Sequence, residues 1–401
     1  MLDERDWDSQ YALMFRLWLE RAECEFLSGN VDKAEQLIME LLRRGTSKVD
    51  KAAVYHLKVH LQIVKGEYSQ AVESALACLR LFGIDIPAQP TWEQAEAEYE
   101  TLWRNLNGRP IENLIDLPLM TDPELLATMH ALEALLVSAY YTDLHLFCLH
   151  LCLGVKISLK HGTSGASAIG CGWLGTILGP VFRRYSDGYR LAKLGCDLVE
   201  KHGFIASQAK VHYAMGLAAL WTQPITTALD FNRAVFRTAI ETGALTYACY
   251  SVYESVTILL LRNDPLDEAW RESETGLDFA RKARFRDQTD AIVSQQRFIA
   301  TMQGRTATFS TFSDASFDET VFEAQLMTED RMHTMVCFYW ILKLKARFLS
   351  GDYAEALAAA DKAKELLWSG LGHIVLLDYY CYTALIVAAL YVNASADEQT
   401  N

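Results

Sequence analysis

A short turn motif recurs along this chain and constrains its fold more than any other feature. Three copies are clear: Gly29 to Ala34, Gly66 to Ala71 and Gly351 to Ala356. Each places a small residue first, Tyr or another apolar residue two positions later, and Ala three positions after that. Three looser copies pair an apolar residue with a small one, as Tyr185 with Gly188, Ile225 with Ala228 and Leu266 with Ala269.

The spacing of the six copies predicts the architecture. Their first positions lie at Gly29, Gly66, Arg183, Gln223, Asp264 and Gly351. Successive copies are 37, 117, 40, 41 and 87 residues apart, which fits one, three, one, one and two periods of about 40. This period predicts an all-α fold, an α-α superhelix or TPR-like solenoid of antiparallel helix hairpins, which usually holds partners. Arg183, where the motif prefers Gly, predicts that its hairpin turns differently.

The composition agrees with helices around a large core. Hydrophobic residues make up 51% of the 401 residues and charged residues only 22%, so the chain can bury a core and is not disordered. The 8 prolines fall mostly between helical stretches, and apolar and polar residues nowhere alternate long enough to predict a sheet. The Ala of each motif lets two helices approach closely, so a larger side chain at Ala71 is expected to open its hairpin.

The net charge and the cysteines indicate which partners and which cellular compartment to expect. The formal net charge of −14 predicts no nucleic-acid partner, because an acidic chain repels phosphate. The densest basic stretch, Arg281 to Arg286, is expected to end a helix and to complement its dipole. Nine scattered cysteines predict buried thiols in a reducing compartment. Since Met1 to Trp7 lacks the apolar stretch of a signal peptide, we expect a cytoplasmic protein.

Helix signals and breaks predict the order of segments. Gly83 is expected to cap a helix, Thr91 and Gln94 to form a capping box, and Asp122 with Pro123 to start another helix. The expected segments are N-terminal TPR-like repeats (1–107), an irregular connector (108–123), a central helical-repeat array (124–302), a polar loop (303–318), C-terminal helical repeats (319–392) and a polar tail (393–401). The connector is the expected seam between repeats, and the polar loop is expected at the surface or as a flexible linker.

Two apolar stretches, 165–182 and 374–392, are long enough to test for a membrane span. The first holds five glycines and Pro180, and the second is interrupted by Asp378 and several tyrosines. We expect both to be buried repeat helices.

Two patterns suggest chemistry but are better explained by packing. Gly170 to Gly175 matches GxGxxG, yet the residues before it are small and helical rather than a β-branched strand, so the match predicts tight helix packing. His145, Cys148 and Cys152 share one helix stripe, but a structural zinc site needs a fourth ligand and usually CxxC spacing. Their leucine-rich surroundings predict a buried stripe.

The sequence offers no further catalytic pattern. GxSxG, HExxH, GxxxxGK[ST] and kinase signatures are all absent, so we predict no catalytic residue, no cofactor and no metal ligand. Most of the 18 Tyr, 17 Phe and 9 Trp occupy apolar helix faces. Some, such as Tyr140-Tyr141 or Tyr379-Tyr380, are candidates to line a concave groove.

Several segments in order carry a resemblance to a known family. They are Ala22 to Gly29, Leu79 to Pro87, Leu117-Pro-Leu-Met-Thr-Asp-Pro-Glu124, Ser158 to Gly162 with Ser167-Ala168, Gly188 to Ala192, and Glu241 to Tyr250. Together they resemble the helical-repeat region of very large bacterial and fungal signalling proteins, the multi-sensor signal transduction multikinases. Those proteins join this region to a Ser/Thr kinase, an AAA-type ATPase module, a GAF sensor and a sensor histidine kinase. The resemblance implies ATP-binding and phosphotransfer residues in other domains, and no position here matches them.

Three functions are compatible with these patterns. The first is a non-catalytic scaffold or regulatory segment of a signal-transduction kinase that makes contacts between proteins or domains. The alternative is a solenoid that senses a small molecule or peptide, as in related ATPase-type transcription activators. The third is an enzyme in its own right, which the missing motifs disfavour. The partner-binding residues cannot be assigned from the sequence.

Overall fold

The computed structural model describes residues 6–328 and 331–391, and helices dominate them. In these ranges the only extended pairing is a single parallel bridge between Leu119 and Thr163. The expected all-α fold is confirmed. The chain divides into two compact units after Cys171, and each unit is described by itself. Residues 393–401, expected as a polar tail, lie outside the described residues.

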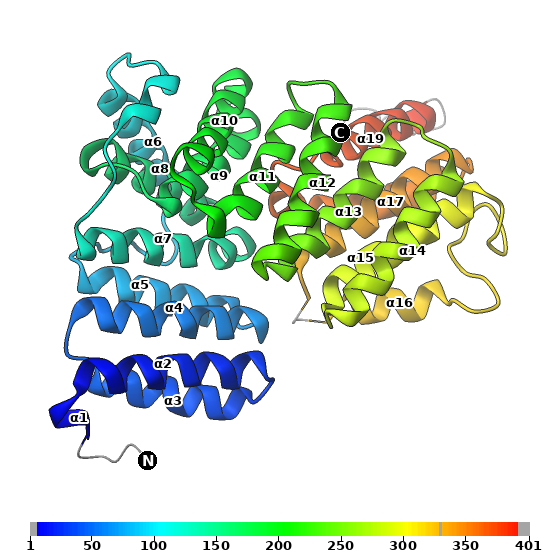
Figure 1. The fold of residues 1–401 in the computed structure, drawn as a ribbon. Coiled ribbons are helices and arrows are strands. Elements are labelled where there is room, and N and C mark those ends of the chain that lie inside the picture. The colour runs from blue at the N-terminus through cyan, green and yellow to red at the C-terminus, as the bar shows by residue number, and fades with distance from the viewer. Residues whose placement is uncertain (1–5, 329–330, 392–401) are drawn as a thin grey trace. The chain divides into compact units, whose positions relative to one another are not determined.

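The first unit contains α1 to α8, a 3-10 helix η1 and the beginning of α9. Their bounds are α1 (Asp6–Ser9), α2 (Tyr11–Leu27), α3 (Val31–Arg44), α4 (Lys48–Val64), α5 (Tyr68–Leu81), α6 (Trp92–Leu106), η1 (Ile111–Asp116), α7 (Pro123–Thr142), α8 (Leu144–His161) and α9 (Gly165–Phe182). Helices α2 and α3 pack as one antiparallel hairpin and α4 and α5 as the next, while α7 covers α4 and α5 and α8 contacts α6 and α7 (Figure 1).

The second unit continues from Gly172 with hairpins of the same kind. It contains α10 (Tyr185–His202), α11 (Ile205–Leu220), α12 (Ile225–Thr242), α13 (Leu245–Leu261), α14 (Leu266–Lys282), α15 (Arg286–Met302), α16 (Glu319–Leu326), α17 (His333–Leu349), α18 (Tyr353–Lys364), η2 (Leu367–Gly370) and α19 (Leu376–Tyr391). From α10 to α15 each helix packs on the next along the chain, and α17 then contacts α15, α18 and α19 (Figure 1).

The repeated motif marks the start of the second helix in six hairpins. Its apolar position is the first residue of α3, α5, α10, α12, α14 and α18. The small position that follows is buried in every copy, and the alanines there, at 34, 71, 228, 269 and 356, are fully covered. In the remaining copy, a Cβ at Gly188 would lie 2.5 Å from the backbone oxygen of Gly175. Close approach of two helices explains why only small residues occupy this position.

The turn before the motif is left-handed where the sequence has Gly, with φ of +82° at Gly29 and +78° at Gly66. Arg183 adopts the same left-handed region, with φ of +58°. Its closing hydrogen bond differs, however, because Arg184 N donates to Leu178 O, six residues back, whereas Asn30 N donates to Glu25 O, five residues back. This hairpin therefore shares the left-handed residue but closes a wider turn.

The connector 108–123 joins helices that pack together. It contains η1, and α7 after it covers the α4–α5 hairpin before it. The Thr91–Gln94 capping box and the Asp122 N-cap before Pro123 are both present, as expected. The division between units falls at Cys171, so the connector is an internal part of the first unit.

The polar segment 303–318 is irregular but anchored by one aromatic side chain. Phe312 is fully buried, and its ring lies 5.9 Å from that of Tyr339. The N–H of Phe312 donates a hydrogen bond of 2.9 Å to Glu319. Glu319 in turn pairs with Arg347 and Lys343 of α17. Burial alone would raise the pKa of Glu319, but the Phe312 N–H and the two cations hold it below its ordinary value.

Candidate partner-binding groove

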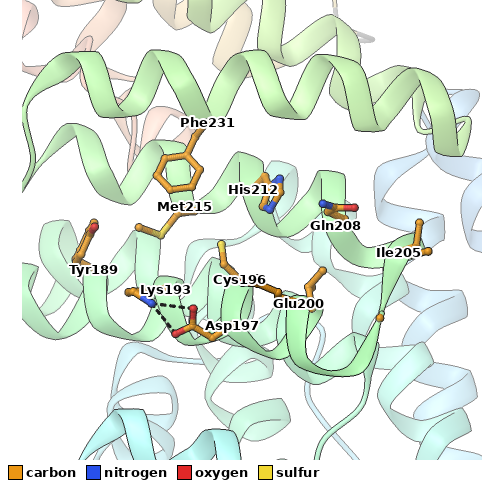
Figure 2. A pocket seen from close by; sticks show the side chains of 12 residues that line it. Tyr189, Lys193, Cys196, Asp197, Glu200, Ile205, Gln208, His212, Met215 and Phe231 are labelled. Carbon is orange, nitrogen blue, oxygen red and sulfur yellow. Dashed lines mark hydrogen bonds and ion pairs between the residues drawn. The ribbon is translucent and has the colours of Figure 1, made fainter.

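A groove of about 600 Å³ runs between α10 and α11 in the second unit. Its walls are two stripes at helical spacing, with Phe231 of α12 beside Met215. The stripes are Tyr189, Lys193, Cys196, Asp197 and Glu200 on α10 and Ile205, Gln208, His212 and Met215 on α11. Figure 2 shows His212 and Met215 facing Cys196 across the groove. The α10 stripe extends about 16 Å along the helix axis.

The local sequence explains why these two helices leave a groove. On α10 the residues Leu191, Leu194 and Leu198 are buried in the core, whereas the stripe that begins at Tyr189 lies at the edge of the core and is half-buried or exposed. Gly203, with φ of +68°, ends α10 and turns the chain into α11. The groove side of α11 carries polar side chains such as Gln208 and His212, which fill the space between the helices only in part.

The floor of the groove is apolar. Met215 is buried in a cluster with Ala192 and Ala218, and Tyr189, Cys196 and Phe231 pack against this cluster. Burial raises the pKa of the Cys196 thiol to about 12. A thiol that stays protonated at neutral pH is a packing group rather than a nucleophile.

The rim of the groove carries charges. Lys193 Nζ lies 2.7 Å from Asp197 Oδ2, and this hydrogen bond raises the pKa of Lys193. The pair is largely exposed and contributes little to stability. Glu200 is exposed one turn further along α10. Because Lys193 and Asp197 cancel, Glu200 leaves this rim with a net negative charge.

His212 is the most informative polar group in the groove. Its Nδ1 is buried and has no hydrogen-bond partner, and its ring lies 6.3 Å from that of Phe231. Burial lowers the pKa of His212, which favours the neutral imidazole. A neutral imidazole donates from one ring nitrogen and accepts at the other. The wall of the groove thus contains one buried hydrogen-bonding atom without a partner, beside an apolar floor.

The helix stripe of His145, Cys148 and Cys152 is a packing feature. Both thiols are fully buried, and burial raises the pKa of Cys148 to about 12. His145 Nδ1 lies 3.2 Å from the carbonyl oxygen of Pro90. Within the ranges 6–328 and 331–391, His, Cys, Asp and Glu nowhere gather in threes that could hold a metal ion.

The GxGxxG match lies inside α9, so it does not follow a strand. A Cβ at Gly172 would lie 3.3 Å from the Cβ of Ala214, and one at Gly175 would lie 2.5 Å from the oxygen of Gly188. These glycines bring helices close together, as the sequence predicts. In the described part of the chain, α9 alone is long and apolar enough to cross a membrane, and 72% of it is buried in the structure.

The two tyrosine pairs do not line the groove. Tyr141 is buried and lies 5.2 Å, ring to ring, from Tyr68. Both residues of the second pair belong to α19. Tyr379 is buried on the inner side of this helix, whereas Tyr380 is 60% exposed on its outer side. The groove residues themselves were not predicted from the sequence. The sequence pattern that could have indicated the groove is a polar residue at every helical turn of α10 and α11, on faces that are otherwise apolar and typical of a core.

Comparisons with known proteins agree with a distant link to signalling. No family model matches the chain. It is similar to hybrid signal transduction histidine kinase G of Dictyostelium discoideum, with 21% identity over 323 residues. The alignment covers 75% of this chain and 9% of that kinase, so the chain spans about a tenth of the relative it matches. This distant similarity suggests a role related to signalling, and the multidomain arrangement expected from the resemblance stays a prediction.

Proposed function

We propose that this chain is a non-catalytic helical-repeat segment of a signalling protein, and that its α10–α11 groove binds a segment of a partner protein or of a neighbouring domain. The observation that carries the proposal is the groove itself, in which Tyr189 and Phe231 are half-buried over an apolar floor at Met215. The similarity to a histidine kinase supports the signalling context. We also propose a cytoplasmic location and no nucleic-acid partner.

The chemistry of the groove defines the segment that would fit. An apolar side chain would cover Tyr189 and Phe231, which are half-buried, and burial of apolar surface would supply most of the binding free energy. A Lys or Arg on the same segment would meet Glu200 at the rim, where charge mainly affects specificity and association rate. The imidazole of His212, which lines the groove, would lie against the polar backbone of the segment beside this anchor.

A peptide array tests this proposal. The full chain is applied to peptides that combine one large apolar residue with a basic, neutral or acidic residue at varied spacing. We expect binding to require the apolar residue and to prefer the basic one, and to weaken when Phe231 is truncated. Equal binding to acidic and basic peptides, or no binding to any peptide, would contradict the proposal.

A second candidate function is recognition of a small molecule in the same groove. Its volume of about 600 Å³ lies within the range of about 300–1,000 Å³ that is usual for small-molecule sites. A thermal-shift screen separates the two, because a ligand at 100 times its dissociation constant adds about 2.7 kcal/mol of stability. A hit that disappears in Phe231→Ala would favour this candidate, and a screen without hits would remove it.

A further inference from the structure

The outer face of α19 is an exposed apolar stripe. On its inner side, Leu376, Tyr379 and Ile386 are buried, where α19 packs on α17 and α18 (red in Figure 1). The opposite side is exposed at helical spacing and consists of Leu377, Tyr380, Cys381, Ala384, Leu385, Val387 and Ala388, which we call the α19 stripe. Tyr380 is 60% exposed and Val387 53%.

The stripe carries no charge. The charged residue of α19, Asp378, lies outside the stripe, and the Nζ of Lys345 is 2.9 Å from its Oδ2. A helix that is apolar on all sides is normally buried on all sides. A contiguous exposed apolar face of this kind marks an interaction surface.

A row of small residues along the stripe favours a second copy of the same stripe as the occupant. When two such helices cross antiparallel on a twofold axis at Ala384, Ala384 meets its own copy and Cys381 of one copy lies beside Ala388 of the other. On the other side of the axis, Tyr380 of one copy packs beside Val387 of the other. The small residues let the two helices approach closely, and no like charges approach each other.

The size of the stripe predicts the strength of this contact. From the exposed fractions, a pair of stripes would bury roughly 1,000 Å² in total, which is the lower end of specific interfaces. We propose that the α19 stripe joins two copies of this chain in an antiparallel, twofold and weak dimer. This surface is separate from the groove, so the dimer does not depend on what the groove binds.

Sedimentation of the full chain across the micromolar range tests the proposal. Val387→Glu places a charge in the stripe, and Val321→Glu on α16 is the matched control because Val321 is 55% exposed. We expect a reversible dimer whose dissociation constant rises at least about tenfold in Val387→Glu and stays unchanged in Val321→Glu. A wild-type chain that remains monomeric, or a dimer that Val387→Glu leaves intact, would overturn the proposal.

Disulfide trapping tests the register independently. In a Cys24→Ser, Cys381→Ser background, Ala384→Cys places a thiol on the proposed axis. Under mild oxidation we expect a covalent dimer to form faster from Ala384→Cys than from Val321→Cys. Equal rates would show that Ala384 does not lie at the centre of an interface.

Discussion

The Nδ1 of His373 lies 2.7 Å from Oε1 of Glu254, although 119 residues separate the two in the chain. Both side chains are buried, with exposures of 6% and 2%. Glu254 belongs to α13, and His373 precedes α19, where its ring also packs 5.1 Å from that of Phe338. The neighbouring Gly372 accepts a hydrogen bond of 2.8 Å from the indole of Trp221. These contacts attach the last helix of the second unit to its middle.

Loss of this buried contact should destabilise the second unit. Glu254→Ala removes the buried carboxylate that His373 Nδ1 contacts, which we expect to cost about 1–3 kcal/mol in the free energy of unfolding. Glu254→Gln keeps an acceptor oxygen and should cost less. Urea unfolding measures both, with Glu241→Ala, an exposed carboxylate on α12, as the control. Equal free energies of unfolding for Glu254→Ala and the control would show that the contact does not stabilise the fold.

Overpacking the small position of a repeat should open its hairpin. Ala71 is fully buried on α5, and a leucine there exceeds the space between the helices. We expect Ala71→Leu to lower the free energy of unfolding by about 1–3 kcal/mol. Ala97→Leu on α6 is the matched control, because Ala97 is exposed. Similar unfolding curves for the two variants would mean that close helix packing does not limit the size of the side chain at position 71.

Local signals in the sequence predicted much of the fold. The capping box at Thr91, the N-cap at Asp122 and the buried small residue of each repeat depend on neighbours a few positions away. Such interactions can be read from the sequence because the helix itself sets their geometry. At Arg183 the missing Gly predicted a different turn, and the turn is wider, although its tertiary context still holds Arg183 in the left-handed region.

Contacts between distant segments could not be predicted in this way. The pairing of Glu254 with His373, or of Glu319 with Arg347, joins segments that are distant in the sequence and produces no periodic pattern in it. Phe312 shows the same limit, because its polar neighbours predict a surface loop while its own side chain is fully buried. The groove was missed for a related reason. Whether a polar residue on a core-like helix faces solvent or a partly filled space depends on how the next helix packs.

The buried His150 should make stability depend on pH. Burial lowers its pKa from 6.5 to about 4, so between these values the unfolded chain binds a proton that the folded chain does not. Stability therefore falls as the pH drops through this window, and His150 accounts for up to about 3 kcal/mol of the loss. We expect His150→Gln to have a shallower slope between pH 6.5 and 4 than the wild type, and His130→Gln, which alters an exposed residue, to keep the wild-type slope. Parallel slopes for all three proteins would contradict this assignment.

The groove should lose affinity when Phe231 is truncated. Phe231 packs on the apolar floor, whereas Phe236, also half-buried on α12, packs 5.3 Å from Phe279 outside the groove. For any peptide found by the array, we expect Phe231→Ala to weaken binding at least about tenfold. Phe236→Ala should leave affinity within a factor of about two. Fluorescence anisotropy measures both, and equal losses would place the peptide elsewhere.

Gly162 should be the least replaceable glycine in the first unit. Its φ is +101°, and a Cβ would lie 2.3 Å from the backbone oxygen of Pro118. That oxygen accepts a hydrogen bond of 2.8 Å from Thr163 N, beside the bridge to Leu119. Gly162→Ala therefore combines backbone strain with a clash, and we expect it to cost about 3 kcal/mol or more. Gly29→Ala is the matched control, because Gly29 has a φ of +82° but no atom within 4 Å of the added Cβ. In the same urea titration, backbone strain alone should lower the free energy of unfolding of Gly29→Ala by about 1 kcal/mol. If Gly162→Ala lost no more stability than Gly29→Ala, the clash with Pro118 would be relieved at no cost in stability.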